Sequence, residues 1–600
     1  MSRSRSSSAR SPPSTRSNEG VVERQGGWVR FGDEGTGGIL ADFLRDAPPV
    51  HAKNLYNLYV YFWRWALWKV FESGAGRGIV TFITASSYLR GPGFAGMRRH
   101  MREVFDELWI VDLGGEGRGA RRSENVFAIQ TPVAIAIGYR SDDVRSAIPA
   151  RVRYARIDGT RDEKLDRLSR VHSVDDLEWR DCFSGWLQPF VPERSGDYFS
   201  WPALTDLFPW QQSGLKAGRT WPIAPDANVL SERWRRLSAA SATERRALFV
   251  ERPTGRKVRD TPPPLAGANP ESSIQALEVT SSVPSRVRFA FRSLDRQYVI
   301  ADSRVIDRPS PHLWRVTSAR QVFMTTLLTG LLAVGPAAIA THLVPDLHHF
   351  RGSFGGKDVI PLWRDAACRE PNVTAGLLDA LAPALGRVEP EDLLAYAYAL
   401  LQAPSYTLRF FEELEIPGPR IPIVRDADLF ARGVSLGRRL VWLHTYGERF
   451  VPDGERAGRV PPGEARYVRP IGARADRFPR SHGYDAEKRE LQVGEGVFAP
   501  VSPEVRAFSV SGLDVVGSWL DYRMRDGAGR RSSPLDDVRP TTWPEAYTEE
   551  LLQLLWVVEH TVALVAELDR LLDDVASSDV FVASELPQPS ERERAAPGES

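Results

Sequence analysis

One stretch of the chain, Asn54 to Glu72, constrains the fold more than any other part of the sequence. Its nineteen residues, NLYNLYVYFWRWALWKVFE, contain no Gly or Pro, and apolar side chains occur on every face of a helix built from them. Arg64 and Lys69 are the only cations inside it. A helix that is hydrophobic all round is a buried helix. We therefore predict a helix that is buried on most faces and ends before the glycines at 74–78.

Three apolar runs after this helix predict the strands of a sheet. The β-branched run Ile79–Thr84 suits a buried, parallel strand, and Leu108–Leu113 and Val133–Tyr139 predict two more strands. Met97–Glu107, between the first two runs, has the amphipathic pattern of a helix. This order of elements is that of an α/β sheet. Three strands do not make a self-sufficient doubly wound domain, so we predict part of such a sheet.

Changes in composition divide the chain further. A Pro-rich break includes Pro262–Pro264, and residues 452–490 are rich in Gly, Pro and Arg. Pro544 to Val575 has apolar residues three and four apart, which predicts a long helix that packs on another element. The predicted divisions are a disordered tail at 1–27, a first folded region at 28–150, a connecting region at 151–251, a linker at 252–286, a second folded region at 287–450, a loop-rich linker at 451–490, a C-terminal segment at 491–576 and a disordered tail at 577–600.

The overall charge of the chain is almost balanced, so it creates no long-range electrostatic attraction of the whole chain to nucleic acid. The chain has 78 basic and 77 acidic residues, so a DNA-binding face has to be a local patch. Cys182 and Cys368 lack metal-ligand spacing and fit a reducing cytoplasm. The longest apolar stretch, Val322–Ala340, is interrupted by Thr, Gly and Pro, which favours buried strands or a core helix over a membrane span. We expect a cytoplasmic protein with no membrane partner.

The most tempting local motif is Trp109–Gly119, WIVDLGGEGRG, in which a strand runs into a Gly-rich turn. Dinucleotide and S-adenosylmethionine sites begin in this way, but their loop then opens a helix. Here another strand follows, which favours a plain loop. The pair His348-His349 has no partner at metal-ligand spacing, and no hydrolase or phosphate-loop motif occurs. We predict no catalytic, cofactor-binding or metal-binding residues.

Six blocks, taken in order, resemble the large single-polypeptide restriction–modification enzymes called type ISP. The first resembles the later half of an amino-group DNA methyltransferase domain, and the others resemble the target-recognition and specificity region. The blocks are Asn54–Tyr139, Phe291–Trp314, Val344–Trp363, Tyr398–Leu414, Pro419–Phe430 and Ser511–Met524. The resemblance implies a partial α/β methyltransferase sheet at 28–150, followed by a mixed α+β recognition region with a long C-terminal helix.

The resemblance also implies a chemistry: transfer of a methyl group from S-adenosylmethionine to adenine N6 in double-stranded DNA. In this family an Asn-Pro-Pro-aromatic element holds the extruded adenine. At the expected place this sequence has Ser11-Pro12-Pro13-Ser14, which lacks both the planar amide and the aromatic ring. We expect the chain alone to be inactive and to bind no cofactor. A separately encoded amino-terminal methyltransferase half is a possible partner, and a non-catalytic specificity subunit and a decayed gene fragment are the alternative interpretations.

Two groups of residues are candidates for the site that the resemblance implies. Ser86, Ser87 and Tyr88 follow the first predicted strand, where the rim of the adenine pocket is expected. Arginines near glycines suit contacts with phosphates and base edges. The DNA-binding candidates are Arg292, Arg296, Arg304, Trp314, Arg315, Arg351 and Lys357. Ion pairing or core packing is an equally good interpretation for each of these seven, and core packing is favoured for Trp314.

Overall fold

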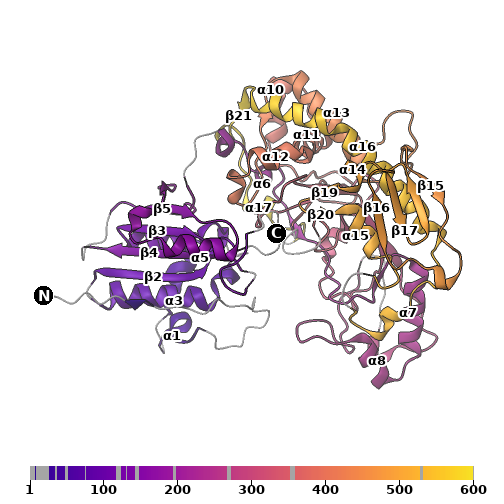
Figure 1. Ribbon diagram of the computed structural model, residues 1–600, viewed down its shortest axis with the longest axis horizontal. Coiled ribbons are helices and arrows are strands. Elements are labelled where there is room, and N and C mark those ends of the chain that lie inside the picture. Colours follow the sequence, from indigo (N-terminus) through magenta and orange to yellow (C-terminus); the bar gives the residue numbers. More distant parts are fainter. Residues whose placement is uncertain are drawn as a thin grey trace. The chain divides into compact units, whose positions relative to one another are not determined.

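The computed structural model describes residues 7–8, 26–33, 37–47, 52–74, 76–115, 123–129, 131–141, 147–192, 197–265, 272–351, 358–527 and 531–598. The chain forms two compact units, each described here by itself (Figure 1). Unit 1 comprises Met1–Gly196 and Glu412–Pro417, and unit 2 comprises Asp197–Phe411 and Gly418–Ser600. The predicted tail at 1–27 lies almost wholly outside the described residues.

Unit 1 is built on one sheet with the strand order β1-β2-β4-β3-β5-β6. β4 lies between β2 and β3 and is antiparallel to both, whereas β3 and β5 are parallel. The strands are β1 (Ser7–Ser8), β2 (Gly78–Ala85), β3 (Glu107–Asp112), β4 (Val133–Arg140), β5 (Arg151–Arg156) and β6 (Arg180–Asp181).

The helices of unit 1 are α1 (Gly27–Phe31), α2 (Ala41–Leu44), α3 (Leu58–Leu67), α4 (Ala95–Val104) and α5 (Arg161–Ser169). Asn57 caps α3 by accepting a hydrogen bond from the Tyr59 amide, and a π-helical turn, Trp68–Glu72, continues the helix. Trp63 projects from α3 onto Phe82 of β2, with ring centroids 4.8 Å apart. The helix, amphipathic segment and strands predicted between residues 54 and 139 are therefore confirmed.

Two expectations about this sheet need correction. β2 was expected to be a parallel strand; it pairs parallel with the two residues of β1, but all eight of its residues pair antiparallel with β4. A β-branched run indicates burial and does not fix direction. The sheet also continues past residue 150, because β5 pairs with β3 along its whole length.

Unit 2 contains several small sheets. The strand orders are β8-β10-β9, β12-β11-β13-β7, β14-β21, β15-β18-β17-β16 and β19-β20. The strands are β7 (Gln212–Ser213), β8 (Ile223–Ala224), β9 (Arg286–Arg292), β10 (Asp295–Ile300), β11 (Phe323–Thr326), β12 (Ile339–Thr341), β13 (Asp358–Pro361), β14 (Ile423–Val424), β15 (Arg466–Arg469), β16 (His482–Asp485), β17 (Glu490–Val493), β18 (Gly496–Ala499), β19 (Ser509–Val510), β20 (Leu513–Asp514) and β21 (Val580–Phe581). The apolar stretch 322–340 supplies β11 and β12, which confirms the interpretation as buried strands.

The helices of unit 2 include a packed group formed by α11, α12, α13 and α16. Gly433 and Gly437 of α13 permit the close approach of α11, because a Cβ at Gly437 would lie 1.8 Å from the Ala395 carbonyl oxygen. The helices are α6 (Leu204–Leu207), α7 (Ala227–Ala239), α8 (Ala242–Phe249), α9 (Pro311–Arg315), α10 (Leu377–Leu385), α11 (Pro390–Gln402), α12 (Pro404–Arg409), α13 (Ala427–His444), α14 (Pro503–Arg506), α15 (Val515–Asp521), α16 (Glu545–Ala576) and α17 (Glu591–Arg594).

Segments expected to be linkers or tails contribute to unit 2. Ile274, inside the predicted linker at 252–286, is fully buried, and β15 and β16 lie inside the predicted linker at 451–490. The predicted tail at 577–600 is ordered as far as residue 598: β21 pairs with β14, and the Arg364 guanidinium donates to the Glu593 carbonyl. The Gly, Pro and polar residues of these segments therefore do not prevent short strands or tertiary contacts.

α16 is the one helix in the described part of the chain that is long and apolar enough to cross a membrane by length and composition. The core helix of a folded domain passes the same test. Leu551, Leu555 and Leu572 are fully buried, and α11, α12 and α13 pack against the helix. The fold is thus mixed α and β, with several small sheets and a long C-terminal helix.

Candidate nucleic-acid interface

A cavity of about 740 Å³ in unit 2 gathers the largest group of cations around one space. It lies between the start of α7, the end of β9 and the segment that connects α15 to α16. The basic residues that line it are Lys216, Arg219, Arg233, Arg252, Arg292, Arg523, Arg525, Arg531 and Arg539. The acidic residues are Asp346, Asp526, Asp536 and Asp537. Cations therefore outnumber anions in the lining, although the whole chain is nearly neutral.

Arg233 holds one wall of the cavity in place. It projects from α7, which Asp226 caps by accepting from the Asn228 amide, and its guanidinium donates to the carbonyls of Trp221 and Ile223 at 3.0 and 2.9 Å. It also donates to the Val538 carbonyl at 3.1 Å. Burial lowers the pKa of Arg233 to about 10, so the side chain stays charged near neutral pH. These hydrogen bonds occupy N–H donors of the Arg233 guanidinium within the protein.

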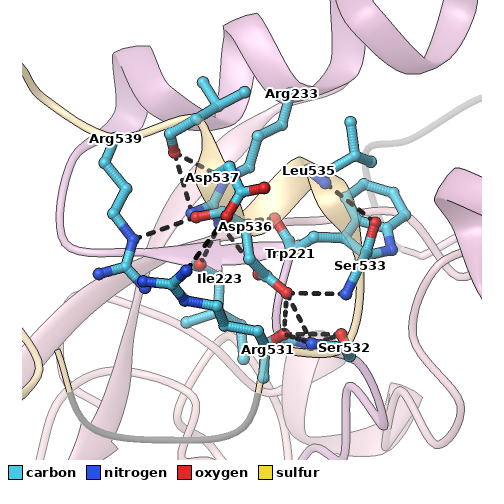
Figure 2. A network of polar contacts seen from close by, with 12 residues as sticks. Trp221, Ile223, Arg233, Arg531, Ser532, Ser533, Leu535, Asp536, Asp537 and Arg539 are labelled. Atoms are coloured by element: carbon cyan, nitrogen blue, oxygen red, sulfur yellow. Dashed lines mark hydrogen bonds and ion pairs between the residues drawn. The ribbon is translucent and has the colours of Figure 1, made fainter. Parts of the chain in front are cut away.

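A short turn, Pro534–Asp537, carries the other wall. The Asp536 carboxylate accepts hydrogen bonds from the amides of Ser532 and Ser533 at 2.8 and 3.0 Å (Figure 2). It also accepts one from the Thr220 hydroxyl at 2.6 Å, which ties this turn to a segment more than 300 residues earlier. The turn is thereby fixed by a buried carboxylate.

Three further arginines of the lining are also satisfied internally. Arg219 pairs with Asp307 at 2.7 Å, and Arg292 pairs with Asp346 at 2.8 Å while its guanidinium lies over the Phe291 ring. Arg523 is completely buried and bonds to Asp295 at 2.9 Å. Burial opposes its charge, but Asp295 and Glu550 hold the pKa of Arg523 above its ordinary value. These side chains form part of the cavity wall, and acidic partners balance their charges.

Four arginines differ from these because their side chains reach solvent; we call Arg252, Arg525, Arg531 and Arg539 the rim arginines. Arg252 and Arg525 are exposed, the Arg531 side chain is 54% exposed, and Arg539 is partly exposed. Arg539 donates to the carbonyls of Asp536 and Arg525 at 3.1 and 2.9 Å. Burial, and then repulsion from Arg531, lowers the pKa of Arg539. Figure 2 shows the guanidinium groups of Arg531 and Arg539 beside each other.

The rim is chemically suited to a polyanion. Guanidinium groups donate in a fork that fits a phosphate or the edge of a guanine, and two adjacent guanidinium groups repel one another until an anion lies between them. Asp537 offsets part of this charge, since it lies 3.4 Å from Arg531, whereas Asp526 lies 3.3 Å from Arg480, which is not a rim arginine. Both acids are exposed, so these pairs are weak and can be exchanged for a ligand.

The structure distributes the predicted DNA-binding residues over several places. Among these candidates, Arg292 is the one that lines the cavity. Arg296 lies over the Tyr446 ring, 3.4 Å from its centroid, and bonds to Gln553. Arg304 is buried and held by Asp302 at 2.6 Å and by the Ser272 carbonyl. Arg304 is therefore an ion-paired residue of the fold, as the alternative interpretation predicted. Arg296 also makes internal contacts.

The remaining candidates lie outside the cavity lining. Trp314 packs partly buried between two core clusters and donates to the Pro309 carbonyl at 2.7 Å. Arg315 is exposed in the last turn of α9. Arg351 donates to the Leu331 carbonyl at 3.1 Å. Lys357 lies outside the described residues.

The three predicted pocket-rim residues in unit 1 do not share one exposed surface. Ser87 is exposed, but Ser86 and Tyr88 are buried, and Tyr88 has no accessible surface. The Tyr88 ring contacts Trp63 and Phe190, and its burial raises its pKa. Tyr88 is thus a core residue of unit 1.

Asp112, the last residue of β3, belongs to an internal charge cluster. It is 1% exposed and accepts from Arg90 at 2.6 Å, from the Tyr154 hydroxyl at 2.8 Å and from the Gly114 amide at 2.9 Å. These bonds give the Asp112 carboxylate a structural role in unit 1. Within the described residues, no group of three His, Cys, Asp or Glu side chains could hold a metal ion.

Comparison with known families decides where the chain belongs. A profile of the type ISP C-terminal specificity domain matches residues 206–554, more than half of the chain and all four rim arginines. The chain belongs to this family. No curated protein matches it in sequence.

Solved type ISP structures share the fold. A nuclease-deletion mutant of the type ISP enzyme LlaGI with a DNA substrate mimic is 17% identical over 88% of this chain and 42% of its own, with a TM-score of 0.61. The ATP-dependent type ISP enzyme LlaBIII bound to DNA is 16% identical over 90% and 35%, with a TM-score of 0.63. A DrdV–DNA complex is 19% identical over 89% and 54%, with a TM-score of 0.61. This chain thus spans between about a third and a half of their lengths.

Sequence reasoning missed the rim arginines. The criterion of arginines near glycines would have found Arg525 and Arg531, since both flank the run Asp526 to Arg530, DGAGR. That run begins two residues after the last block that resembles the family. No local signal identifies Arg252 or Arg539, which reach the rim through tertiary contacts alone.

Proposed function

We propose that this chain supplies sequence-specific DNA recognition to a type ISP-like restriction–modification enzyme. The observation that carries the proposal is the rim of four arginines inside the matched specificity domain. The solved relatives are complexes with DNA or a DNA mimic, which supports the same class of ligand. Double-stranded DNA fits because a local basic rim on a neutral chain binds phosphates without a whole-molecule field.

In this proposal the two groups of arginines have different roles. Arg233, Arg219 and Arg523 fix the cavity walls through internal bonds. The rim arginines contact phosphates or guanine edges, because they combine exposure with a fixed position. Arg539 is the best-oriented of the four, since two backbone carbonyls hold it.

The chemistry of the intact enzyme is, in our proposal, methyl transfer from S-adenosylmethionine to adenine N6. The described contacts after β3 give no support for a cofactor site there, since Asp112 already accepts hydrogen bonds from Arg90, Tyr154 and Gly114. We therefore assign cofactor and adenine binding to no residue described here. A cytoplasmic location follows from access to genomic DNA.

The decisive experiment measures which duplexes the purified chain selects from a random-sequence library, and how affinity depends on salt. We expect a defined motif and a steep loss of affinity as salt rises. The double variant R531A/R539A should lose about 2–6 kcal/mol of binding free energy, at about 1–3 kcal/mol for each contact. R387A is the matched control, because Arg387 is an 88% exposed arginine outside the cavity. Equal binding by the double variant and the control would overturn the role of the rim.

A second candidate function is a non-catalytic DNA-specificity subunit that works with a separate catalytic half. The match to the specificity domain over residues 206–554 supports it. Co-expression with a polypeptide that carries the cofactor and Asn-Pro-Pro-aromatic motifs should then restore adenine methylation at the selected motif. Methylation by the chain alone would exclude this alternative.

A further inference from the structure

Two oppositely charged side chains of the cavity lining, Arg531 and Asp537, are bonded to each other at the surface. The Arg531 guanidinium donates to the Asp537 carboxylate at 3.4 Å, beside Arg539 (Figure 2). The two side chains are 54% and 61% exposed. Within the part of the chain that the structure describes, this weak bond is the only hydrogen bond that either side chain makes. We call these two residues the rim pair.

The backbone at Asp537 is fixed, although its carboxylate is exposed. Leu535, two residues earlier, is fully buried, and the neighbouring Asp536 carboxylate is buried and accepts from two backbone amides. On the other side of Asp537, the Val538 carbonyl accepts from Arg233 at 3.1 Å. The rim pair therefore presents a donor and an acceptor group at a defined place on the cavity rim.

A carboxylate on this rim needs a reason, because it repels the phosphates that the rim arginines attract. Asp346 and Asp536 are buried and bonded inside the fold, and Asp526 pairs with Arg480, which is outside the cavity lining. Among the described acids of the lining, Asp537 is the one whose ion-pair partner is a rim arginine. A carboxylate that faces DNA can accept a hydrogen bond from the N4 amino group of cytosine.

The rim pair fits the major-groove edge of a G·C base pair. Guanine presents the adjacent acceptors N7 and O6 there, and cytosine presents its N4 amino group. O6 and N4 are joined by a hydrogen bond of about 2.9 Å, close to the 3.4 Å between the Arg531 nitrogen and the Asp537 oxygen. The fork of a guanidinium needs two adjacent acceptors, which guanine offers and adenine does not. We propose that Arg531 donates to the guanine and Asp537 accepts from the cytosine of one G·C pair in the recognised DNA; this rests on the proposed function above.

Selection from a random-sequence duplex library by the full chain tests this assignment. For D537A we expect discrimination at one G·C position of the motif to fall by about fivefold or more, with the other positions unchanged. Affinity for a duplex without the motif should rise, because a negative charge near the phosphates is removed. D574A is the matched control, since Asp574 is 52% exposed and pairs with Arg432 at 2.6 Å but lies outside the cavity lining. A D537A chain that keeps every position of the motif would overturn the assignment.

Modified bases separate a contact with this base pair from a general effect of charge. N4-methylcytosine removes the amino hydrogen that faces the major groove, and 7-deazaguanine removes the N7 acceptor. We expect each to weaken binding by the unsubstituted chain about fivefold or more, whereas D537A should lose less than about twofold with N4-methylcytosine and R531A less than about twofold with 7-deazaguanine.

Equal weakening of the substituted and unsubstituted chains by these bases contradicts the role of the rim pair. Dependence of an A·T position on Asp537 would overturn the assignment to a G·C pair. An unsubstituted chain that selects no motif at all contradicts the proposed function itself, and the rim pair with it.

Discussion

α3 in unit 1 and α16 in unit 2 are both strongly apolar helices, but they differ in how the rest of the chain covers them. α16 packs against α11, α12 and α13, and Leu551, Leu555 and Leu572 are fully buried. α3 is buried on the sheet side, whereas its Leu58, Phe62 and Trp65 are 46%, 44% and 43% exposed. The comparison teaches that an apolar sequence pattern identifies a helix that is largely buried, whereas the segments that cover it come from distant parts of the chain.

The units also differ in how they bury ionisable groups. In unit 1, burial disfavours the charge of Glu72, but hydrogen bonds from His100 and Arg64 hold its pKa at about 2. In unit 2, burial lowers the pKa of His349 and His444 to about 3, so both are neutral in the fold. Thr325 contacts His349, and Tyr398 and Thr561 contact His444. Glu72 of unit 1 is therefore held in its charged form, whereas these two histidines of unit 2 are neutral, although unit 2 also buries charged pairs such as Arg523 with Asp295.

The largest effect should distinguish the two apolar helices directly. L555A removes a fully buried side chain of α16 and should lower the free energy of unfolding by about 2–5 kcal/mol. F62A on the exposed face of α3 is the matched change and should cost less than about 1 kcal/mol, because Phe62 is 44% exposed. Denaturant unfolding followed by far-UV circular dichroism measures both. Equal losses would show that α3 is covered after all.

Acid should unfold unit 2 before unit 1. A histidine with a lowered folded pKa stabilises the fold above its unfolded pKa of 6.5, and this stability is lost as pH falls toward 3. The loss is about 1.4 kcal/mol for each histidine and each pH unit. Glu72 keeps its contribution until pH falls below its ordinary pKa of 4.5. Hydrogen exchange at pH 5.5 should therefore show faster exchange in α13 than in β2; the reverse order would refute this difference.

G437A tests the close packing that covers α16. A Cβ at this position would lie 1.8 Å from a backbone oxygen of α11, which cannot move as a side chain can. We expect a loss of at least about 1–3 kcal/mol in thermal or chemical unfolding. S435A on the exposed face of the same helix is the control and should be neutral or slightly stabilising. If G437A left the free energy of unfolding unchanged, α11 and α13 would have to lie further apart than the structure places them.

The smallest effect concerns one rim arginine. R252A removes one exposed cation from the cavity and should reduce the salt dependence of DNA binding by about one unit of slope, without altering the selected motif. Fluorescence anisotropy over a salt series measures this slope. A change of motif would assign Arg252 to a base edge instead of a phosphate.

Local pattern was sufficient for much of the fold. The absence of Gly and Pro and the even spread of apolar residues predicted α3, the spacing of leucines predicted α16, and β-branched runs predicted β2 and β4. Strand direction was not predictable, because pairing depends on which strand lies beside β2 in space. Of the candidate DNA-binding residues, Arg292 reached the cavity, while Arg304 proved to be held by Asp302 only two residues earlier.

The sequence by itself determined the family, the main helices and strands, and that α3 is buried on most of its faces. Tertiary structure alone decided which arginines face solvent and which side of α3 stays open. The physical reason is distance along the chain: Arg252 and Arg539 are brought to one rim by bonds such as that between Thr220 and Asp536. Helix periodicity is a local property of neighbouring residues, whereas a shared cavity depends on contacts between segments hundreds of residues apart.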